Sequence, residues 1–389
     1  VEYAEKDAEI TLALWKELEK EINSQNLHSI LKLETDVLPC LVEMKWRGVK
    51  INEDHVVVLE KKFKHIYDKC LESVKKQTGI FPEVWAARSI AKVCEHLGIK
   101  DYERTPITQA PSFTKNWLSN HSNRTLRNIA SARTADKLRS TFIETIKNYV
   151  VNGKIHADIN QLKGDQGGTL TGRLSYARPN LQQLPNYNDF GTGIRSLFLP
   201  NSKEERWGCF DYSQQEPRLV VHYALRTPGI TGISDIAQEY KAKDSTADFH
   251  NLVAKLANID RREAKTINLG LFYGMGQAKL QTQLGINSEV EAKALIRKYH
   301  HKVPFVKQLM NSVMDRAQDS GQIRTIGGRL CRFNKWEPKD WDRRDLYDTW
   351  EEASRENGSG NVKRAFTYKA LNRLIQGSAA DMTKKAMIN

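Results

Sequence analysis

Four side chains with contrasting chemistry recur at intervals of four residues: Arg261, Lys265, Leu269 and Tyr273. At 3.6 residues per turn they lie along one face of a helix, with a drift of about 40° per step. A core face would not begin with two cations, and a solvated face would not end with Leu and Tyr. The gradient suits a ligand with an anionic end and a flat end, such as a nucleotide. An ordinary amphipathic helix with snorkelling cations is the alternative.

A second candidate is a carboxylate, Asp211, at the end of the mostly apolar segment 207–211. This segment predicts a buried strand, and residues 213–225 after it predict a helix. A carboxylate at the end of a buried strand is typical of a metal ligand or a catalytic group.

The helix that carries the first four residues has predicted boundaries. Asp260 and Glu263 form a D-x-x-E variant of the capping box at its start. Gly274 and Gly276 supply a stop signal at its end.

The first half of the chain reads as helices. Residues 1–23 predict a polar-rich helix with Tyr3 and Asp7 one turn apart, a pair that can hold a metal-bound water or simply be a solvated helix start. A second helix is predicted over 27–48, followed by a short extended piece at 49–51. Asn52 is the expected cap of a long helix that runs to about residue 77.

Further along, a helix over about 124–150 carries Arg133, Lys137 and Arg139. Its basic edge suits the backbone of a nucleic-acid duplex, with plain surface charge as an equal alternative. Glycines around Thr169 and Thr171 predict close backbone approach to a partner, or a flexible surface loop.

The last third predicts a hairpin at 321–333 and a charged surface insertion at 334–362. A closing helix is predicted over 363–387, with Asn372 and Gln376 one turn apart.

The composition points to a polyanionic partner. The chain of 389 residues has 60 Lys and Arg against 47 Asp and Glu, a formal net charge of +13. Its pI near 9.3 favours nucleic acid first and an anionic membrane second, but the mean hydropathy of −0.59 and the lack of an apolar run of about 18 residues argue against a membrane. The five cysteines lack C-x-x-C spacing and read as reduced thiols of a cytoplasmic protein.

In chain order, these pieces resemble the family A DNA polymerases, the class of bacterial polymerase I and related phage replicases. The matching segments are TGRLS at 171–175 and PNLQ at 179–182, DYSQQEPR at 211–218 (motif A), Arg261-x-x-x-Lys265 with Tyr-Gly at 273–274 (motif B) and QGSAAD at 376–381. The short connection from His250 to Lys265 resembles the phage replicases more than bacterial polymerase I.

The resemblance implies an α+β right-hand fold, with a palm sheet and helical thumb and fingers. The implied domains are a C-terminal remnant of a 3′–5′ exonuclease domain at 1–26, thumb at 27–152, first part of the palm at 153–223, fingers at 224–310 and second part of the palm at 311–389. Tyr3 and Asp7 would then be the third exonuclease motif, and its acidic partners would lie before Val1.

The implied activity is DNA-directed DNA synthesis, a nucleotidyl transfer from a dNTP to a primer 3′-OH with two Mg²⁺ ions. Asp211 would bind both ions with help from the Tyr212 carbonyl. Arg261, Lys265 and His250 would hold the triphosphate, and Lys265 could protonate the leaving pyrophosphate.

Other positions receive roles around the base pair and the sugar. Tyr273 would stack near the nascent pair, Glu216 would block a ribose 2′-OH, and Gln214 would be a further nucleotide contact. Leu269 stands where the family usually has Phe or Tyr. Because Leu lacks the Tyr hydroxyl that can replace a missing 3′-OH, we expect discrimination against dideoxynucleotides.

The implied macromolecular partner is a primer–template duplex, with a processivity factor as a further candidate and the host-cell cytoplasm as the place of action. Residues expected to reach minor-groove acceptors or the bases nearby are Arg173, Asn180, Gln182, Asn372 and Gln376. Arg133 and Lys137 would hold duplex phosphates.

Since the chain starts at Val1 and stops at Asn389 inside a helical pattern, we expect a piece of a longer protein. Motif C, with the second metal-binding Asp, would lie beyond Asn389, so the piece is expected to bind primer–template but to extend it poorly.

Two rival functions remain open at this point. A single-subunit RNA polymerase shares the hand and motif B, but Glu216 argues against an enzyme that accepts ribose. A non-catalytic DNA-binding protein of the same fold is the other, and the retained Asp211, Lys265 and Arg261 argue against it.

Overall fold

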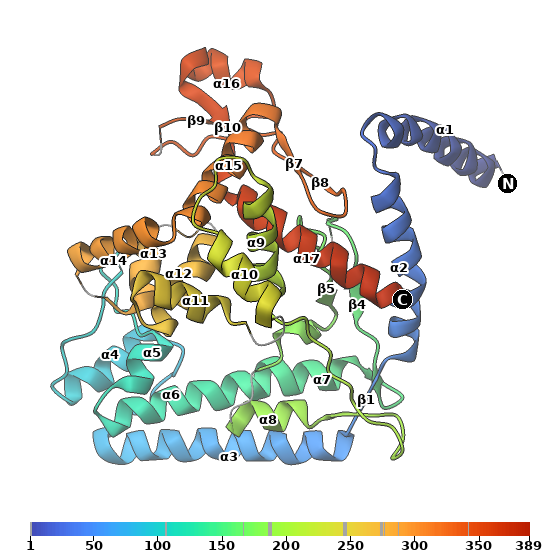
Figure 1. Ribbon diagram of the computed structural model, residues 1–389. Helices are drawn as coiled ribbons and strands as arrows, with labels where there is room; N and C mark the ends of the chain where they lie inside the picture. The colour runs from blue at the N-terminus through green and yellow to red at the C-terminus, as the bar shows by residue number, and fades with distance from the viewer. Residues whose placement is uncertain are drawn as a thin grey trace. The chain divides into compact units, whose positions relative to one another are not determined.

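The computed structural model divides into two compact units (Figure 1). It describes residues 2–105, 107–165, 167–185, 189–243, 247–272, 275, 277–286, 288–340 and 342–389. Unit 1 comprises Val1–Leu41, Asn160–Leu174 and Cys209–Asn389, and unit 2 comprises Val42–Ile159 and Ser175–Gly208.

Unit 2 is built on the long helix α3 (Glu53–Thr78), which packs against α6 (Arg124–Lys137) and the π-helical turn that follows it at Leu138–Ile143. Its other helices are α4 (Ala87–His96), α5 (Lys115–Asn120), α7 (Glu144–Tyr149) and α8 (Asp189–Arg195). The Asn52 side chain accepts a hydrogen bond from the His55 amide at 3.1 Å, and Gly79 ends α3 in the left-handed conformation. These contacts confirm the predicted limits of α3.

A small antiparallel sheet lies beside these helices in unit 2. Its strand order is β2-β3-β1-β6, with β1 (Val49–Ile51), β2 (Val150–Val151), β3 (Lys154–Ile155) and β6 (Phe198–Leu199). A separate pair is formed by β4 (Asp158–Asn160) and β5 (Ser175–Ala177). The core has two buried clusters, one around Phe63 and Ile143 and one around Ile90, Leu118 and Leu126.

Unit 1 is mainly helical. Its helices are α1 (Glu2–Ser24), most of α2 (His28–Arg47), α9 (Gln215–Arg226), α10 (Ser234–Lys243), α11 (Phe249–Ala257), α12 (Arg261–Phe272), α13 (Gln277–Leu284), α14 (Glu289–Lys302), α15 (Pro304–Ser320), α16 (Trp350–Asn357) and α17 (Ala370–Ile388). The Phe249 ring lies 6.0 Å from Phe272 and 6.2 Å from Phe305, so aromatic contacts join α11 to α12 and α15.

Two hairpin-like pairs complete unit 1. The predicted hairpin is confirmed as β7 (Gln322–Arg324) with β8 (Leu330–Arg332). The second pair, β9 (Trp336–Pro338) with β10 (Val362–Arg364), corrects the sequence prediction of a helix from residue 363. Because Val362–Arg364 pair with β9, the closing helix begins only at Ala370.

The strand predicted at 207–211 is wrong. These residues have no regular secondary structure, and the Phe210 side chain is 99% exposed. A short apolar segment becomes a strand only where another strand offers it a hydrogen-bonding edge, and none of the described strands pairs with it.

A network of charged side chains ties α2 to α17. Lys384 is 1% exposed and donates to both carboxylate oxygens of Glu34, at 2.8 and 2.9 Å. Arg329 bonds Glu34 as well and donates to Asp381 at 2.9 Å. Burial alone would raise the pKa of Glu34, but the hydrogen bonds from Lys384 and Arg329 outweigh it and the pKa is lowered. Glu34 is therefore ionised at neutral pH.

We expect Lys384→Met to lower the free energy of unfolding by about 3 kcal/mol, because it removes one of the two cations that pair with the largely buried Glu34 carboxylate. Urea unfolding followed by tryptophan fluorescence measures the change. Lys20→Met is the matched control, since Lys20 pairs with Glu17 at an exposed site and should change stability by less than about 1 kcal/mol. Equal effects of the two substitutions would contradict the role of the buried network.

Candidate nucleotide-binding site

The helix α12 presents the predicted cationic face. The Asp260 amide donates to Glu263 Oε2 at 3.1 Å and the Arg262 amide donates to Asp260 Oδ1 at 2.6 Å, which confirms the capping box. Arg261 and Lys265 are exposed. The opposite face packs into the core through Ala264, Ile267, Asn268, Leu271 and Phe272.

The last two positions of the predicted face are Leu269 and Tyr273. Leu269 is half-buried on α12. Tyr273 lies outside the described residues, so its stacking role stays a prediction.

Asp248 joins α12 to the start of α11. Its Oδ1 atom accepts hydrogen bonds from the amides of His250 at 2.9 Å and Asn251 at 3.2 Å, which caps α11. Its Oδ2 atom accepts from Arg261 Nε at 3.0 Å and Nη2 at 2.7 Å. Burial would raise the pKa of Asp248, but the hydrogen bond from Arg261 and those from the two amides lower it overall. The carboxylate is therefore ionised and shared by two helices.

Asp248 is a site residue that sequence reasoning did not select. A signal was present, because an Asp directly before the apolar run FHNLVAKLA is typical of a helix N-cap. Nothing in the local pattern shows that the same carboxylate would reach Arg261.

His250 lies at the first turn of α11 and is 8% exposed. Its Nδ1 atom is 3.1 Å from the side-chain nitrogen of Asn268. Burial lowers the pKa of His250; Asp248 raises it, and the cations Arg261 and Lys265 lower it further. The net pKa is below the ordinary value, so the ring is neutral at pH 7.

Motif A contributes a second capping side chain for α11. Gln214 has φ of 53°, and its Oε1 atom accepts from the Phe249 amide at 2.8 Å and from the Tyr240 hydroxyl at 3.1 Å. Its side-chain nitrogen donates to the Ala247 carbonyl. Gln214 thus positions the segment that leads into His250.

Glu216 and Arg173 meet at the start of α9. Arg173 Nη2 donates to Glu216 Oε1 at 3.0 Å. The Glu216 side chain is 14% exposed and that of Arg173 is 48% exposed. The pair brings the TGRLS segment to motif A.

Asp211 and Tyr212 are exposed and precede α9 in irregular backbone. No hydrogen bond or ion pair links the Asp211 carboxylate to another residue that the structure describes. Within those same residues, no group of three or more His, Cys, Asp or Glu side chains is arranged to hold a metal ion. The Asp211 carboxylate can supply oxygen ligands of the kind that Mg²⁺ prefers.

The residues predicted to bind DNA lie in several elements. Arg133 on α6 donates to the Val84 carbonyl at 2.5 Å and the Phe113 carbonyl at 2.8 Å. Its guanidinium lies 5.4 Å from the centre of the Trp85 ring. Lys137 lies beside Arg133 in a cavity of about 380 Å³. Arg133 thus holds unit 2 together, whatever it contributes to DNA binding.

The other predicted DNA-binding residues are partly or fully accessible. The Asn180 side chain accepts from the Gln182 amide at 3.0 Å, and both side chains are exposed. Asn372 and Gln376 are half-buried on α17.

Tyr3 and Asp7, the predicted exonuclease pair, are exposed on α1, where no residue is buried. Their proposed role stays a prediction. No helix within the described residues has both the length and the apolar character needed to cross a membrane.

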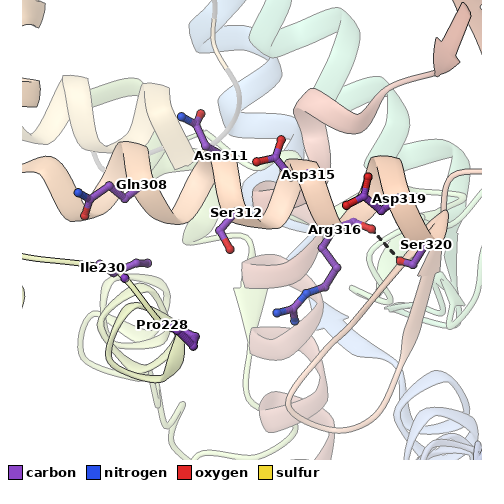
Figure 2. A pocket seen from close by; sticks show the side chains of 10 residues that line it. Pro228, Ile230, Gln308, Asn311, Ser312, Asp315, Arg316, Asp319 and Ser320 are labelled. Carbon is purple, nitrogen blue, oxygen red and sulfur yellow. Dashed lines mark hydrogen bonds between the residues drawn. The ribbon is translucent and has the colours of Figure 1, made fainter.

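A cavity of about 600 Å³ in unit 1 lies between α15 and residues 228–230 (Figure 2). Figure 2 shows Asp315, Arg316 and Asp319 along this face of α15, where all three are exposed. None of the predicted site residues lines it, so the candidate site is the surface at the starts of α11 and α12.

Comparison with known proteins supports one family. The model of DNA polymerase family A matches residues 54–389. The chain is 34% identical to a DNA-directed DNA polymerase of Pseudomonas phage M6 and 28% identical to a DNA polymerase I of Rhizobium leguminosarum. Both alignments cover 99% of this chain. It spans 61% of the phage protein and 36% of the bacterial one.

A solved structure is similar over nearly the whole chain. The polymerase domain of Pol1 from M. smegmatis, in complex with DNA primer–template and dNTP, matches with a TM-score of 0.74 and 26% identity. The match covers 97% of this chain and 63% of that one. The hand-like α+β fold expected from the sequence is thereby confirmed, and the chain belongs to DNA polymerase family A.

Proposed function

We propose that the chain carries the DNA-synthesising part of a phage-type DNA polymerase, which transfers nucleotides from dNTPs to the 3′-OH of a primer on a template. The observation that carries the proposal is the cationic surface where Asp248 holds Arg261 beside His250 and Lys265. Family membership and the primer–template and dNTP in the M. smegmatis complex support it. Neither a single-subunit RNA polymerase nor a non-catalytic binding protein is favoured by these comparisons.

In this proposal the triphosphate binds at the start of α12. Arg261 and Lys265 would form charged hydrogen bonds to phosphate oxygens, and the helix N-terminus adds partial positive charge. His250 would donate a further hydrogen bond, and Lys265 could pass a proton to the leaving pyrophosphate. Leu269 would face the sugar and Tyr273 the nascent base pair.

The proposed metal ligands are the Asp211 carboxylate and the Tyr212 carbonyl. In this proposal they bind two Mg²⁺ ions. Bound Mg²⁺ would neutralise charge on the triphosphate and activate the primer 3′-OH. A titration with Mn²⁺, followed by the electron paramagnetic resonance signal of the ion, compares the Mn²⁺ affinity of the wild type with that of Asp211→Asn.

The DNA duplex is proposed to run along the residues predicted from the motifs. Those near the minor groove are Arg173, Asn180, Gln182, Asn372 and Gln376, and those near phosphates are Arg133 and Lys137. The same proposal includes the domain limits drawn from the sequence. It also includes action in the host-cell cytoplasm and a processivity factor as a further partner.

Arg261→Ala and Lys265→Ala should each weaken dNTP binding to the chain on primer–template by about tenfold or more, because a charged hydrogen bond contributes about 1.5–3 kcal/mol. Fluorescence titration with a labelled dNTP measures the affinity. Arg262→Ala is the matched control, an exposed Arg next in the chain that should change affinity by less than about twofold. Loss of affinity in all three variants alike would contradict a site on this face.

Glu216→Ala should raise the use of rNTPs relative to dNTPs by about tenfold or more, because it opens space next to the sugar. Single-nucleotide extension by the intact protein measures the ratio. Glu216→Gln keeps the volume but loses the ion pair with Arg173, and it should still exclude rNTPs. Unchanged discrimination in Glu216→Ala would argue against this role.

Leu269→Tyr should increase incorporation of dideoxynucleotides by about tenfold or more, since the new hydroxyl can stand in for the missing 3′-OH. Leu269→Phe adds the ring without the hydroxyl and should stay close to the wild type. If the wild type already uses dideoxy- and deoxynucleotides equally, the assignment of Leu269 to the sugar is wrong.

A further inference from the structure

Behind His250 lies a buried polar relay that joins three helices. Asn268 on α12 and Tyr299 on α14 are both 0% exposed. The Tyr299 hydroxyl donates to Asn268 Oδ1, and Asn268 Nδ2 faces His250 Nδ1 at 3.1 Å. Helix α11, which carries His250, packs on both α12 and α14 (Figure 1).

The direction of the relay follows from its buried hydroxyl. If the Asn268 amide were turned round, its nitrogen would face Tyr299 and the phenol proton would need another acceptor. Among the residues that the structure describes, the Tyr299 hydroxyl has no other hydrogen-bond partner. An unpaired donor in such a buried place destabilises the fold, so the phenol keeps Asn268 Oδ1 directed at itself.

The proton on His250 follows from the amide. A side-chain amide nitrogen only donates, so His250 Nδ1 must accept and cannot carry a proton. A neutral imidazole then carries its proton on Nε2. No described residue is hydrogen-bonded to Nε2, which leaves this donor available to a ligand.

We propose that Tyr299 and Asn268 are positioning residues, which hold His250 in the Nε2–H form so that it donates a hydrogen bond to a nucleotide phosphate. The inference rests on the proposed function for the identity of the ligand, but not for the relay itself. In the opposite tautomer, Nε2 would present a lone pair to an anionic oxygen and repel it.

The charges around the ring agree with this assignment. Burial lowers the pKa of His250, Asp248 opposes this, and Arg261 and Lys265 act in the same direction as burial. Because the ring is neutral, its tautomer decides whether Nε2 donates or accepts. In a doubly protonated ring, the Nδ1–H donor would face the Asn268 amide hydrogens, and the two donors would repel each other.

The relay can be tested without nucleotide or DNA. In two-bond ¹⁵N–¹H NMR spectra of ¹⁵N-histidine-labelled protein, the signal lost in His250→Gln identifies His250. We expect the wild type to show the Nε2–H form. Asn268→Asp should shift His250 to Nδ1–H or to the doubly protonated ring, because a carboxylate accepts where the amide donated. Tyr299→Phe is a milder change that should add a fraction of Nδ1–H.

An Nδ1–H ring in the wild type would overturn the proposal. So would a tautomer that stays unchanged in both Asn268→Asp and Tyr299→Phe. Since Tyr299→Phe preserves the shape of the core, it tests the relay even if Asn268→Asp does not fold.

The consequence for the ligand is tested by dNTP affinity on primer–template. Under conditions where NMR shows the Nδ1–H form, Asn268→Asp should weaken binding about tenfold in the wild-type background. In a His250→Gln background it should change affinity by less than twofold, because the Gln amide donates without tautomers. A purely structural role would weaken binding equally in both backgrounds and would overturn the proposal.

The two hypotheses fail differently. Absence of dNTP binding by the folded wild type in the presence of primer–template would contradict the proposed function. The NMR result for His250 would still decide whether the relay exists.

Discussion

The candidate site depends on how one carboxylate divides its two oxygens. Asp248 caps α11 with one oxygen and holds the Arg261 guanidinium with the other. The two helices are thereby joined at the ends where their amide groups point outward. Without this contact, Arg261 would be a long mobile side chain on a solvated helix, and its ordering would cost side-chain entropy when a ligand binds.

The same contact sets the charge of the site. Asp248 balances Arg261, His250 is neutral, and Lys265 is left as the cation without a described partner carboxylate. The two helix N-termini add partial positive charge. This surface therefore suits an anion, which would meet Lys265 and the free side of the His250 ring. Gln214 extends the arrangement to motif A, because it accepts from the first amide of α11.

Much of the fold and part of the site were predictable, because their signals are local. The Asn52 cap, the Asp260–Glu263 capping box and the β7–β8 hairpin each depend on residues within a few positions of one another. The strand predicted at 207–211 failed because a strand depends on a partner elsewhere in the chain. The helix expected from residue 363 starts late for a related reason, since β10 pairs with β9.

By itself, the sequence determined the family, the cationic face of α12 and the residue types proposed to bind a nucleotide. Tertiary structure decided which side chains hold them. Asp248 reaches Arg261 across 13 positions, and Tyr299 reaches Asn268 across 31. Such hydrogen bonds join different helices, so they depend on how the helices pack and not on the pattern along any one of them. For the same reason Arg133, a surface cation by its pattern, binds two backbone carbonyls.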